Sequence, residues 1–242
     1  MNKIKSVLFA AGISLALVFT FSCSSDDSGG SGTSSPCPNA VTGDGTMSCG
    51  GQTYRTVEIG SQTWMAENLN YDVKGSKCYD NDQANCDTYG RLYSWAMAMG
   101  IDAKYNREEW GGSDVKHQGI CPDGWHLPSV AEWNALITEV GDESTAGKYL
   151  KTKTGWNRPK DGGVPGNGTD YYGFSALPGG FGGDSNAFFH GVGDDGFWWS
   201  STEYEYDSNE AYRMGMDHRH EGASTINRSK EGYSMNIRCL QD

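Results

Sequence analysis

The stretch GFWWSSTEY, Gly196 to Tyr204, sets two adjacent tryptophans directly before a run of polar residues. On a β-strand, Trp198 and Trp199 would point to opposite faces, so at most one of the two rings could be exposed. Large rings on a strand pack into the core more often than they contact a ligand. The stretch therefore predicts a core strand, with Trp198, Trp199 and Glu203 as candidate ligand-binding residues if one face is open.

The chain that leads into this stretch, Lys160 to Gly196, is dense in glycine and aspartate. We expect a long irregular loop here, and such loops inside a domain are usually functional or mobile. Calcium binds several converging oxygen atoms, which this loop offers. The cofactor that the sequence allows is thus a structural calcium, with the candidate ligands Asp170, Asp184, Asn186, Asp194 and Asp195. Sugar binding through calcium is not predicted, because the Glu-Pro-Asn and Gln-Pro-Asp triplets of calcium-dependent lectins are missing.

Helices are expected in three places. The clearest is Ser129–Val140, where Ser129 and Glu132 form a capping box and Gly141 ends the helix. Its apolar residues recur at helical spacing and would form one buried face. A second helix is expected over Tyr89–Met99 and a short third one around Ala146–Lys151.

Short strands account for most of the remaining regular structure. A hairpin is expected over Thr53–Leu69, with Gly60 and Ser61 at the turn. A strand that begins at Ala211 would place Tyr212, Met214 and Met216 on one face. The last strand, Tyr233–Leu240, would carry Tyr233, Met235, Ile237 and Cys239 on one face and Ser234, Asn236 and Arg238 on the other.

The N-terminal residues have the pattern of a bacterial export signal. Lys3 and Lys5 precede an apolar segment, Val7–Phe21, that is too short for a typical membrane span. Cys23 follows and is the expected lipidation site, with an ordinary secretory signal as the alternative. The next residues are rich in serine and glycine and suit a flexible linker. The expected organisation is a lipoprotein signal peptide, a linker, a cysteine-containing lead-in and one domain, in residues 1–22, 23–36, 37–51 and 52–242.

Besides Cys23, the chain holds six cysteines, an even number that predicts three disulfides in an exported protein. Six cysteines allow fifteen pairings. We favour Cys37–Cys49 and Cys78–Cys86, each of which closes a short polar loop, and Cys121–Cys239, which joins the middle of the domain to its end. A metal site is the rival hypothesis, but the sequence has no C-x-x-C pair.

The formal net charge is −12, and removal of the signal would delete two lysines and no acidic residue. Such an acidic chain is unsuited to binding nucleic acid or an anionic membrane surface. The bilayer is therefore expected as a partner only through a lipid on Cys23. This predicts an exported protein anchored in the cell envelope, at the outer membrane or the cell surface.

Six segments between Val57 and Leu240 occur in a characteristic order: VEIGSQTWMAENLNY, YGRLYSWAMA, GICPDGWHLPSVAEW, YGFSALPGGF, GFWWSSTEY and GYSMNIRCL. Together they resemble the Fibrobacter succinogenes major paralogous domain family. The resemblance implies an α+β, C-type-lectin-like fold, in which two helices flank small twisted antiparallel sheets and a long Gly/Asp-rich region is irregular. It also implies an exported lipoprotein whose fold is shared with the formylglycine-generating and sulfatase-modifying-factor group.

The function expected from these features is that of a non-catalytic, lipid-anchored module that binds polysaccharide or a surface protein. Two alternatives stay open: an enzyme derived from the formylglycine-generating group, and a purely structural envelope protein. The sequence lacks the G-x-S-x-G, P-loop and dinucleotide-binding motifs. His126, between Trp125 and Pro128, is more simply explained as a hydrogen-bonded structural histidine than as a ligand or a base.

Overall fold

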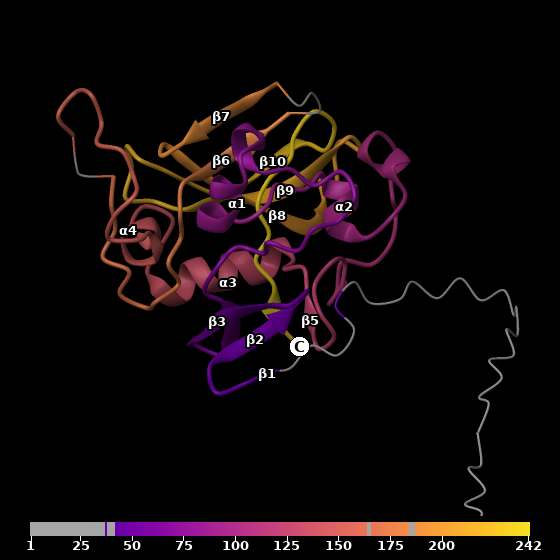
Figure 1. Ribbon diagram of the computed structural model, residues 1–242, viewed down its shortest axis with the longest axis horizontal. Helices are drawn as coiled ribbons and strands as arrows, with labels where there is room; N and C mark the ends of the chain where they lie inside the picture. Colours follow the sequence, from indigo (N-terminus) through magenta and orange to yellow (C-terminus); the bar gives the residue numbers. More distant parts are fainter. Residues whose placement is uncertain (1–36, 38–41, 164–165, 184–186) are drawn as a thin grey trace, which may run out of the picture. The chain divides into compact units, whose positions relative to one another are not determined.

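The computed structural model describes residues 37, 42–163, 166–183 and 187–242, all within the unit Ser34–Asp242. The expected signal peptide, the linker with Cys23, and the candidate calcium ligands Asp184 and Asn186 lie outside the described residues. The described part is a mixed α+β structure with two sheets and four α-helices (Figure 1). None of its helices is long and apolar enough to cross a bilayer.

The first sheet has the strand order β1-β2-β3-β4-β11-β5 and forms the lower layer in Figure 1. Its strands are β1 Thr42–Gly43, β2 Thr46–Cys49, β3 Gln52–Ile59, β4 Gln62–Met65, β5 Trp125–His126 and β11 Leu240–Gln241. The predicted hairpin is confirmed, because β3 and β4 pair across Gly60 and Ser61. The cysteine-containing lead-in adds β1 and β2 to this sheet. Leu240 pairs with both Trp64 and His126, which places β11 between two distant segments.

The second sheet has the strand order β10-β9-β8-β6-β7. Its strands are β6 Gly179–Gly182, β7 Phe189–Val192, β8 Asp195–Glu203, β9 Glu210–Asp217 and β10 Ser224–Ser229. GFWWSSTEY supplies most of β8, the central strand of this sheet. The expectation of one irregular loop over Lys160–Gly196 is wrong in its second half, which forms β6 and β7. These strands were not predicted because glycine is uncommon in strands. Gly179 is required at its position because a Cβ there would clash with Asn236.

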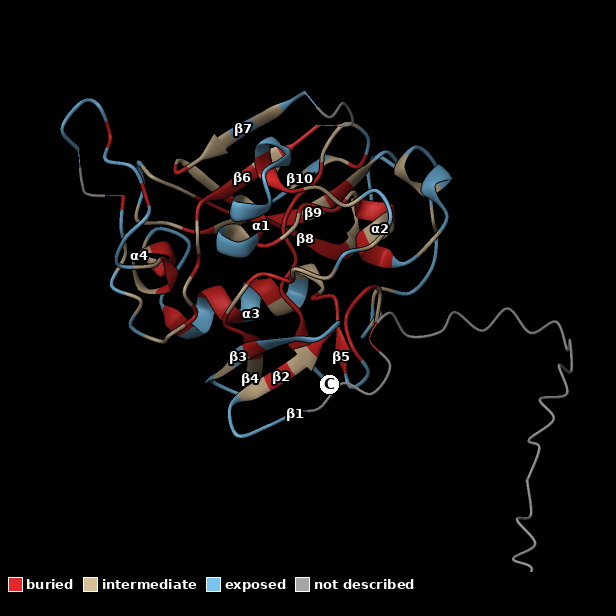
Figure 2. Cartoon of the chain, in the orientation of Figure 1, coloured by how far each residue is buried: buried red, intermediate tan, exposed pale blue. Residues whose placement is uncertain are grey.

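The α-helices are α1 Gln83–Tyr89, α2 Trp95–Met99, α3 Val130–Val140 and α4 Ala146–Leu150. Two 3₁₀ turns, Tyr79–Asn81 and Ala103–Asn106, accompany them. The helix after Ser129 is confirmed together with its capping box, and its buried side turns toward the interior in Figure 2. The short helix after Thr145 is confirmed as well.

The helix predicted over Tyr89–Met99 is wrong in its first half, whereas its second half is confirmed as α2, which ends at Gly100. Helix α1 ends at Tyr89, and Gly90 adopts a φ of 75°, which favours glycine. A Cβ on Gly90 would also clash with Asn68, so the chain needs glycine at this turn. Leu92 and Tyr93 then form isolated bridges with Lys77 and Met235 before α2 begins. The described residues therefore contain four α-helices, where the sequence predicted three and the family resemblance implied two.

The segment before β11 corrects the prediction of a strand over Tyr233–Leu240. It forms single bridges, such as Trp198 with Asn236, and every residue from Ser234 to Leu240 is buried. Met235, Ile237 and Cys239 belong to one hydrophobic cluster, whereas Arg238 stacks on Phe174 of the other cluster. Both sides of the segment are covered because it runs between the two clusters, so a polar, solvent-facing side does not exist.

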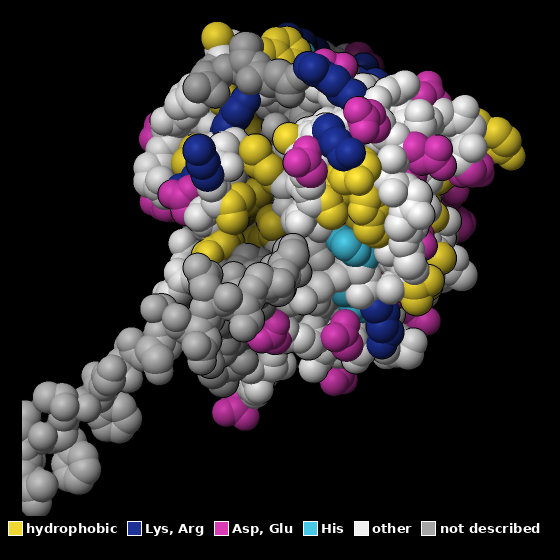
Figure 3. All heavy atoms as spheres, turned by 90° about the vertical axis from the view of Figure 1, so that its right-hand side faces the viewer, with side chains coloured by type: hydrophobic (Ala, Val, Ile, Leu, Met, Phe, Trp, Pro, Cys, Tyr) yellow, Lys and Arg dark blue, Asp and Glu magenta, His cyan; other side chains and the backbone are white. Residues whose placement is uncertain are grey.

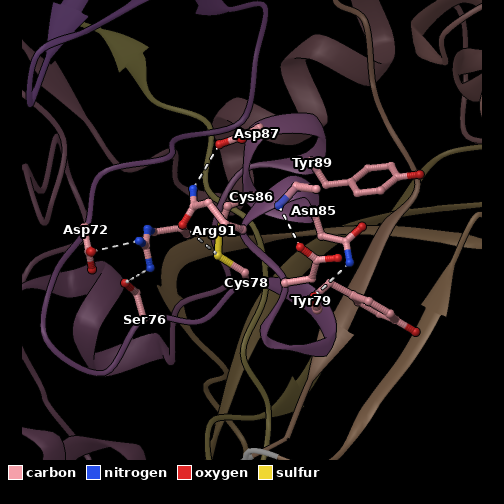
Figure 4. Close-up of a disulfide and its surroundings, with 12 residues drawn as sticks. Asp72, Ser76, Cys78, Tyr79, Asn85, Cys86, Asp87, Tyr89 and Arg91 are labelled. Carbon is pink, nitrogen blue, oxygen red and sulfur yellow. Dashed lines mark hydrogen bonds and ion pairs between the residues drawn. A yellow bond between two sulfur atoms is a disulfide. The ribbon is translucent and has the colours of Figure 1, made fainter.

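The three favoured disulfides, Cys37–Cys49, Cys78–Cys86 and Cys121–Cys239, are confirmed. Figure 4 shows Cys78–Cys86, which joins the turn at Tyr79 to helix α1. Arg91 lies beside it and forms an ion pair with Asp72 at 2.8 Å. Such bonds persist in exported proteins, so the three disulfides agree with export from the cytoplasm.

Candidate functional site

The two tryptophans of GFWWSSTEY are both fully buried, at 0% exposure. They point to opposite faces of β8, as strand geometry requires, and enter different hydrophobic clusters. The indole N–H of Trp198 donates to Asn68, and that of Trp199 donates to the Tyr93 carbonyl. The assignment of Trp198 and Trp199 as ligand-binding residues is therefore wrong, because other parts of the chain cover both rings.

Glu203, the third candidate of this group, is occupied inside the fold. Its carboxylate accepts hydrogen bonds from the backbone N–H groups of Trp110 and Gly111, at 3.0 Å each. It also lies 2.6 Å from the ammonium group of Lys230, whose side chain is completely buried. Glu203 fixes the loop at Trp110 against β8, so the ligand-binding role predicted for it is corrected to a structural one.

The described calcium candidates do not come together. Asp170 accepts hydrogen bonds from the backbone and the hydroxyl of Ser175, and Asp194 accepts one from Asn157. The described residues contain no group of three or more His, Cys, Asp or Glu side chains placed to hold a metal. Since Asp184 and Asn186 lie outside those residues, a structural calcium stays a prediction.

A cleft opens instead on the second sheet, and we name it the aromatic–arginine cleft. It has a volume of about 270 Å³. Its lining residues are Phe181, His190, Asp195, Phe197, Arg213, Arg228, Tyr233 and Met235. An adjoining hollow of about 320 Å³ shares Asp195, Phe197 and Arg213 with it.

Strand register explains how the aromatic residues of the cleft reach one face. Gly180 on β6 pairs in parallel with Gly196 on β8, so the next residues, Phe181 and Phe197, are neighbours. Phe181 also pairs directly with His190 on β7. The ring centroids of Phe181 lie 5.9 Å from Phe197 and 5.6 Å from His190. Residues of three strands thus form a continuous aromatic floor.

The same register brings two arginines to this face. Phe197 pairs with Gly215 on β9, and Arg213, two residues earlier, lies on the same side. Arg213 pairs in turn with Ile226 on β10, and Arg228 follows two residues later. Gly215 leaves the space that the Arg213 guanidinium uses, because a Cβ on Gly215 would clash with it.

In the part of the chain that the structure describes, both arginines stack on aromatic rings and neither forms an ion pair with a carboxylate. The guanidinium carbon of Arg213 lies 3.9 Å above the Phe197 ring, and that of Arg228 lies 4.4 Å above the Tyr233 ring. Arg213 is only 8% exposed, and its Nε has no hydrogen-bond partner among the described residues. Burial and the nearby charge of Arg228 lower the pKa of Arg213 to about 10. A buried cation without an acceptor is costly, so this face is suited to an added acceptor.

Asp195 is the one predicted site residue that the structure places in this cleft. Burial raises the pKa of its carboxyl, and the neighbouring charges of Asp217 and Asp194 raise it further. Its side chain has no hydrogen bond in the described part of the chain. The positive charge of two arginines opposes calcium binding at this place. Asp195 is therefore better suited to hydrogen-bonding a polar ligand than to holding a cation.

Sequence reasoning missed the other residues of the cleft. The signal lay in alternate positions, such as Asp195 with Phe197 and Ile226 with Arg228, which mark one face of each strand. Neighbouring strands come from segments far apart in the sequence, so only the sheet order shows that these faces coincide. The larger hollow beside Pro159, about 720 Å³, is lined mainly by polar residues and offers no Phe, Tyr or Trp ring among them.

His126 joins three parts of the chain and confirms the structural interpretation. It is 1% exposed, with Nδ1 2.7 Å from the carboxylate of Asp242 and Nε2 2.9 Å from that of Glu132. Burial of the imidazole lowers its pKa, but the two carboxylates outweigh burial, so the pKa lies above its ordinary value. For Glu132, burial acts to raise the pKa, but the hydrogen bonds from His126 and Ser129 prevail and lower it.

This arrangement predicts a pH dependence of stability. His126 contributes fully below its unfolded pKa of 6.5, and the contribution is lost as the pH rises through its higher folded pKa. Glu132 contributes fully above its unfolded pKa of 4.5, and the contribution is lost as the pH falls through its lower folded pKa. Both contributions are therefore complete between pH 4.5 and 6.5.

Urea unfolding at a series of pH values would measure this dependence. We expect His126→Gln to remove the loss of stability that the parent shows above pH 6.5. The exposed His220 serves as the matched control, and His220→Gln should leave that loss in place. If the free energy of unfolding fell equally steeply with pH in the His126 variant and in the parent, His126 would not be the group responsible for the loss.

Comparison with known proteins gives one family. A model described as the Fibrobacter succinogenes major domain matches residues 57–241. The match covers every strand of the second sheet and all four helices. No curated protein and no solved structure matches the chain.

Proposed function

The chain belongs to the Fibrobacter succinogenes major domain family, and from this premise and its cleft we propose that it is a non-catalytic binding module for polysaccharide. The proposal places the protein outside the cytoplasm, anchored in the cell envelope through a lipid on Cys23. It also relates the two-sheet fold to the C-type-lectin-like group. A surface protein as the ligand is the alternative within the same class.

The aromatic–arginine cleft is the observation that carries the proposal. Flat aromatic faces suit the C–H faces of sugar rings, and a few polar groups around an apolar floor fix the orientation of a ligand. Phe181 and Phe197 supply the floor, while Arg213, Arg228 and Asp195 supply donors and an acceptor. The cleft lies slightly below the usual range of ligand pockets, about 300–1,000 Å³, so one sugar ring at a time would fill it.

A binding role is favoured over a thiol-based catalytic one by the state of the cysteines. An enzyme of the formylglycine-generating type would use reactive thiols, which must be free to form the thiolate. All six cysteines of the described residues form disulfides with one another. The aromatic–arginine cleft itself contains no cysteine.

We expect the purified domain to bind at least one polysaccharide. Phe181→Ala should weaken that binding by about 3- to 10-fold, which corresponds to the free energy of one aromatic contact. Tyr206→Ala is the matched control, since Tyr206 is an aromatic residue outside the cleft with 80% exposure. Glycan arrays and pull-down on insoluble polysaccharides give the ligand, and titration gives the affinities. Adding a calcium chelator in parallel tests the predicted structural calcium.

Absence of binding to every polysaccharide would remove the proposal. Equal losses in the Phe181 and Tyr206 variants would show that binding occurs elsewhere on the domain.

A further inference from the structure

We propose that the aromatic–arginine cleft recognises a sugar that carries a carboxylate, a uronic acid, through the guanidinium groups of Arg213 and Arg228. This inference rests on the proposed polysaccharide-binding function and names the class of sugar. It is based on two observations. The two guanidinium groups have no anionic partner in the described residues, and aromatic rings and Asp195 line the cleft beside them.

Arg213 is a buried cation that the fold leaves without an acceptor. Its side chain is more than nine-tenths buried, and no hydrogen bond to it occurs among the described residues. The Phe197 ring below it stabilises the charge but accepts no conventional hydrogen bond. Buried polar groups are nearly always hydrogen-bonded, so an unpaired guanidinium at the wall of a cleft indicates a missing anionic partner.

Arg228 reinforces this conclusion because it too has no carboxylate partner within the described residues. Three arginines form such pairs: Arg55 lies 3.1 Å from Glu67, Arg91 2.8 Å from Asp72 and Arg107 2.6 Å from Glu231. No ion pair is found for Arg158, Arg219 or Arg238 within the described residues. Acidic and basic side chains are interspersed on the face that Figure 3 shows. Arg213 and Arg228 differ from these arginines in lining the same cleft, where the charge of Arg228 lowers the pKa of Arg213, so an anion between them would relieve their repulsion.

The geometry favours a carboxylate over other anions. The planar fork of a guanidinium matches a carboxylate with two parallel hydrogen bonds. A phosphate would also match the fork, but its second negative charge would be repelled more strongly by Asp195, which lines the same cleft. Asp195 is free to accept a hydrogen bond from a sugar hydroxyl, and the ring of Phe181, 5.5 Å from that of Tyr233, offers a stacking surface.

Titration of the purified domain with matched sugars tests the inference. The probes are glucuronate and galacturonate, their neutral parents glucose and galactose, and glucose 6-phosphate. We expect each uronate to bind at least tenfold more tightly than its neutral parent, with the preference decreasing as salt is added. Arg228→Gln should abolish the preference, because it lowers the affinity for each uronate far more than that for its neutral parent. Arg228 is exposed, so this variant keeps the fold.

Two further variants complete the design. Arg213→Lys keeps the charge but loses the planar guanidinium, and it should lower the affinity for uronates by a larger factor than the affinity for neutral sugars. Arg158→Gln makes the same charge change as Arg228→Gln at an exposed arginine outside the cleft, and it should have no effect.

The outcomes separate the two proposals. Equal binding of uronates and neutral sugars would overturn the carboxylate inference and leave the binding function standing. Glucose 6-phosphate binding as tightly as glucuronate would also overturn it, in favour of a general anion site. No binding of any sugar, monomeric or polymeric, would overturn both.

Discussion

Replacement of Cys121 and Cys239 by serine is expected to lower the free energy of unfolding by about 5 kcal/mol, the entropy of a loop closed across 118 residues. In a chain of this size, such a loss corresponds to a fall in melting temperature of about 10–20 °C. Both cysteines are completely buried in the same hydrophobic cluster, so two serine hydroxyls there would add a further cost.

The position of this disulfide explains why its effect should spread through the domain. Cys239 directly precedes β11, and Cys121 lies shortly before β5, the strand that pairs with β11. Leu240 also pairs with Trp64 on β4. The bond therefore holds the last strand between two elements that are far apart in the sequence. Its loss would increase the freedom of the unfolded chain and would loosen the β4-β11-β5 end of the first sheet.

The Cys78–Cys86 disulfide provides a matched control within the same chain. Its cysteines are only 8 residues apart, so the double serine variant should lose about 2.5 kcal/mol. Thermal melting followed by circular dichroism and urea unfolding would give both values. A cost for the short loop equal to or above that for the long loop would contradict the entropic explanation.

Features that depend on neighbouring residues in the sequence were predicted well. The capping box at Ser129 and the turn at Gly60 are local signals, and the structure contains both. The disulfide pairing was predicted from two pairs of cysteines that close short loops, which left Cys121 and Cys239 as the third pair. Since these patterns need no knowledge of distant contacts, the sequence alone was enough to predict them.

Features that depend on distant contacts were not predicted. The break at Gly90 results from contact with Asn68, and the strands around Phe181 gain stability only by pairing with β8. The aromatic–arginine cleft has the same origin, because five strands and the segment at Tyr233 contribute to it. Trp198 and Trp199 could be placed on opposite faces from the sequence, but the burial of both faces depends on elements that cover the sheet.

Arg238 is the residue for which sequence and structure differ most. The alternating pattern placed it on a polar face, but its side chain is completely buried. Its guanidinium donates to the side chain of Asn68 at 2.8 Å and to the Ser175 carbonyl at 2.7 Å. It also donates to the Phe174 carbonyl and stacks over the Phe174 ring, with 4.3 Å to the ring centroid.

This one side chain therefore links several separate segments in the interior. Asn68 follows β4, Phe174 and Ser175 precede β6, and Arg238 itself precedes β11. The same Asn68 oxygen accepts the indole N–H of Trp198 at 2.8 Å, so Arg238 also fixes the acceptor that orients the central strand. Removal of the guanidinium would leave buried oxygen atoms without donors, and the penalty for each is about 1–3 kcal/mol.

Arg238→Ala is accordingly expected to lower the free energy of unfolding by about 3–5 kcal/mol, because two or three buried oxygen atoms lose their donor. Arg238→Lys should recover little of this loss, since an ammonium group cannot reach acceptors that are arranged for a planar fork. Arg55 gives the control: its ion pair with Glu67 is exposed, and Arg55→Ala should cost about 0–1 kcal/mol. Urea unfolding of the three variants, followed by tryptophan fluorescence because Trp198 shares the network, measures all of these values. If Arg238→Lys were as stable as the parent, the fork geometry would not be what holds these segments together.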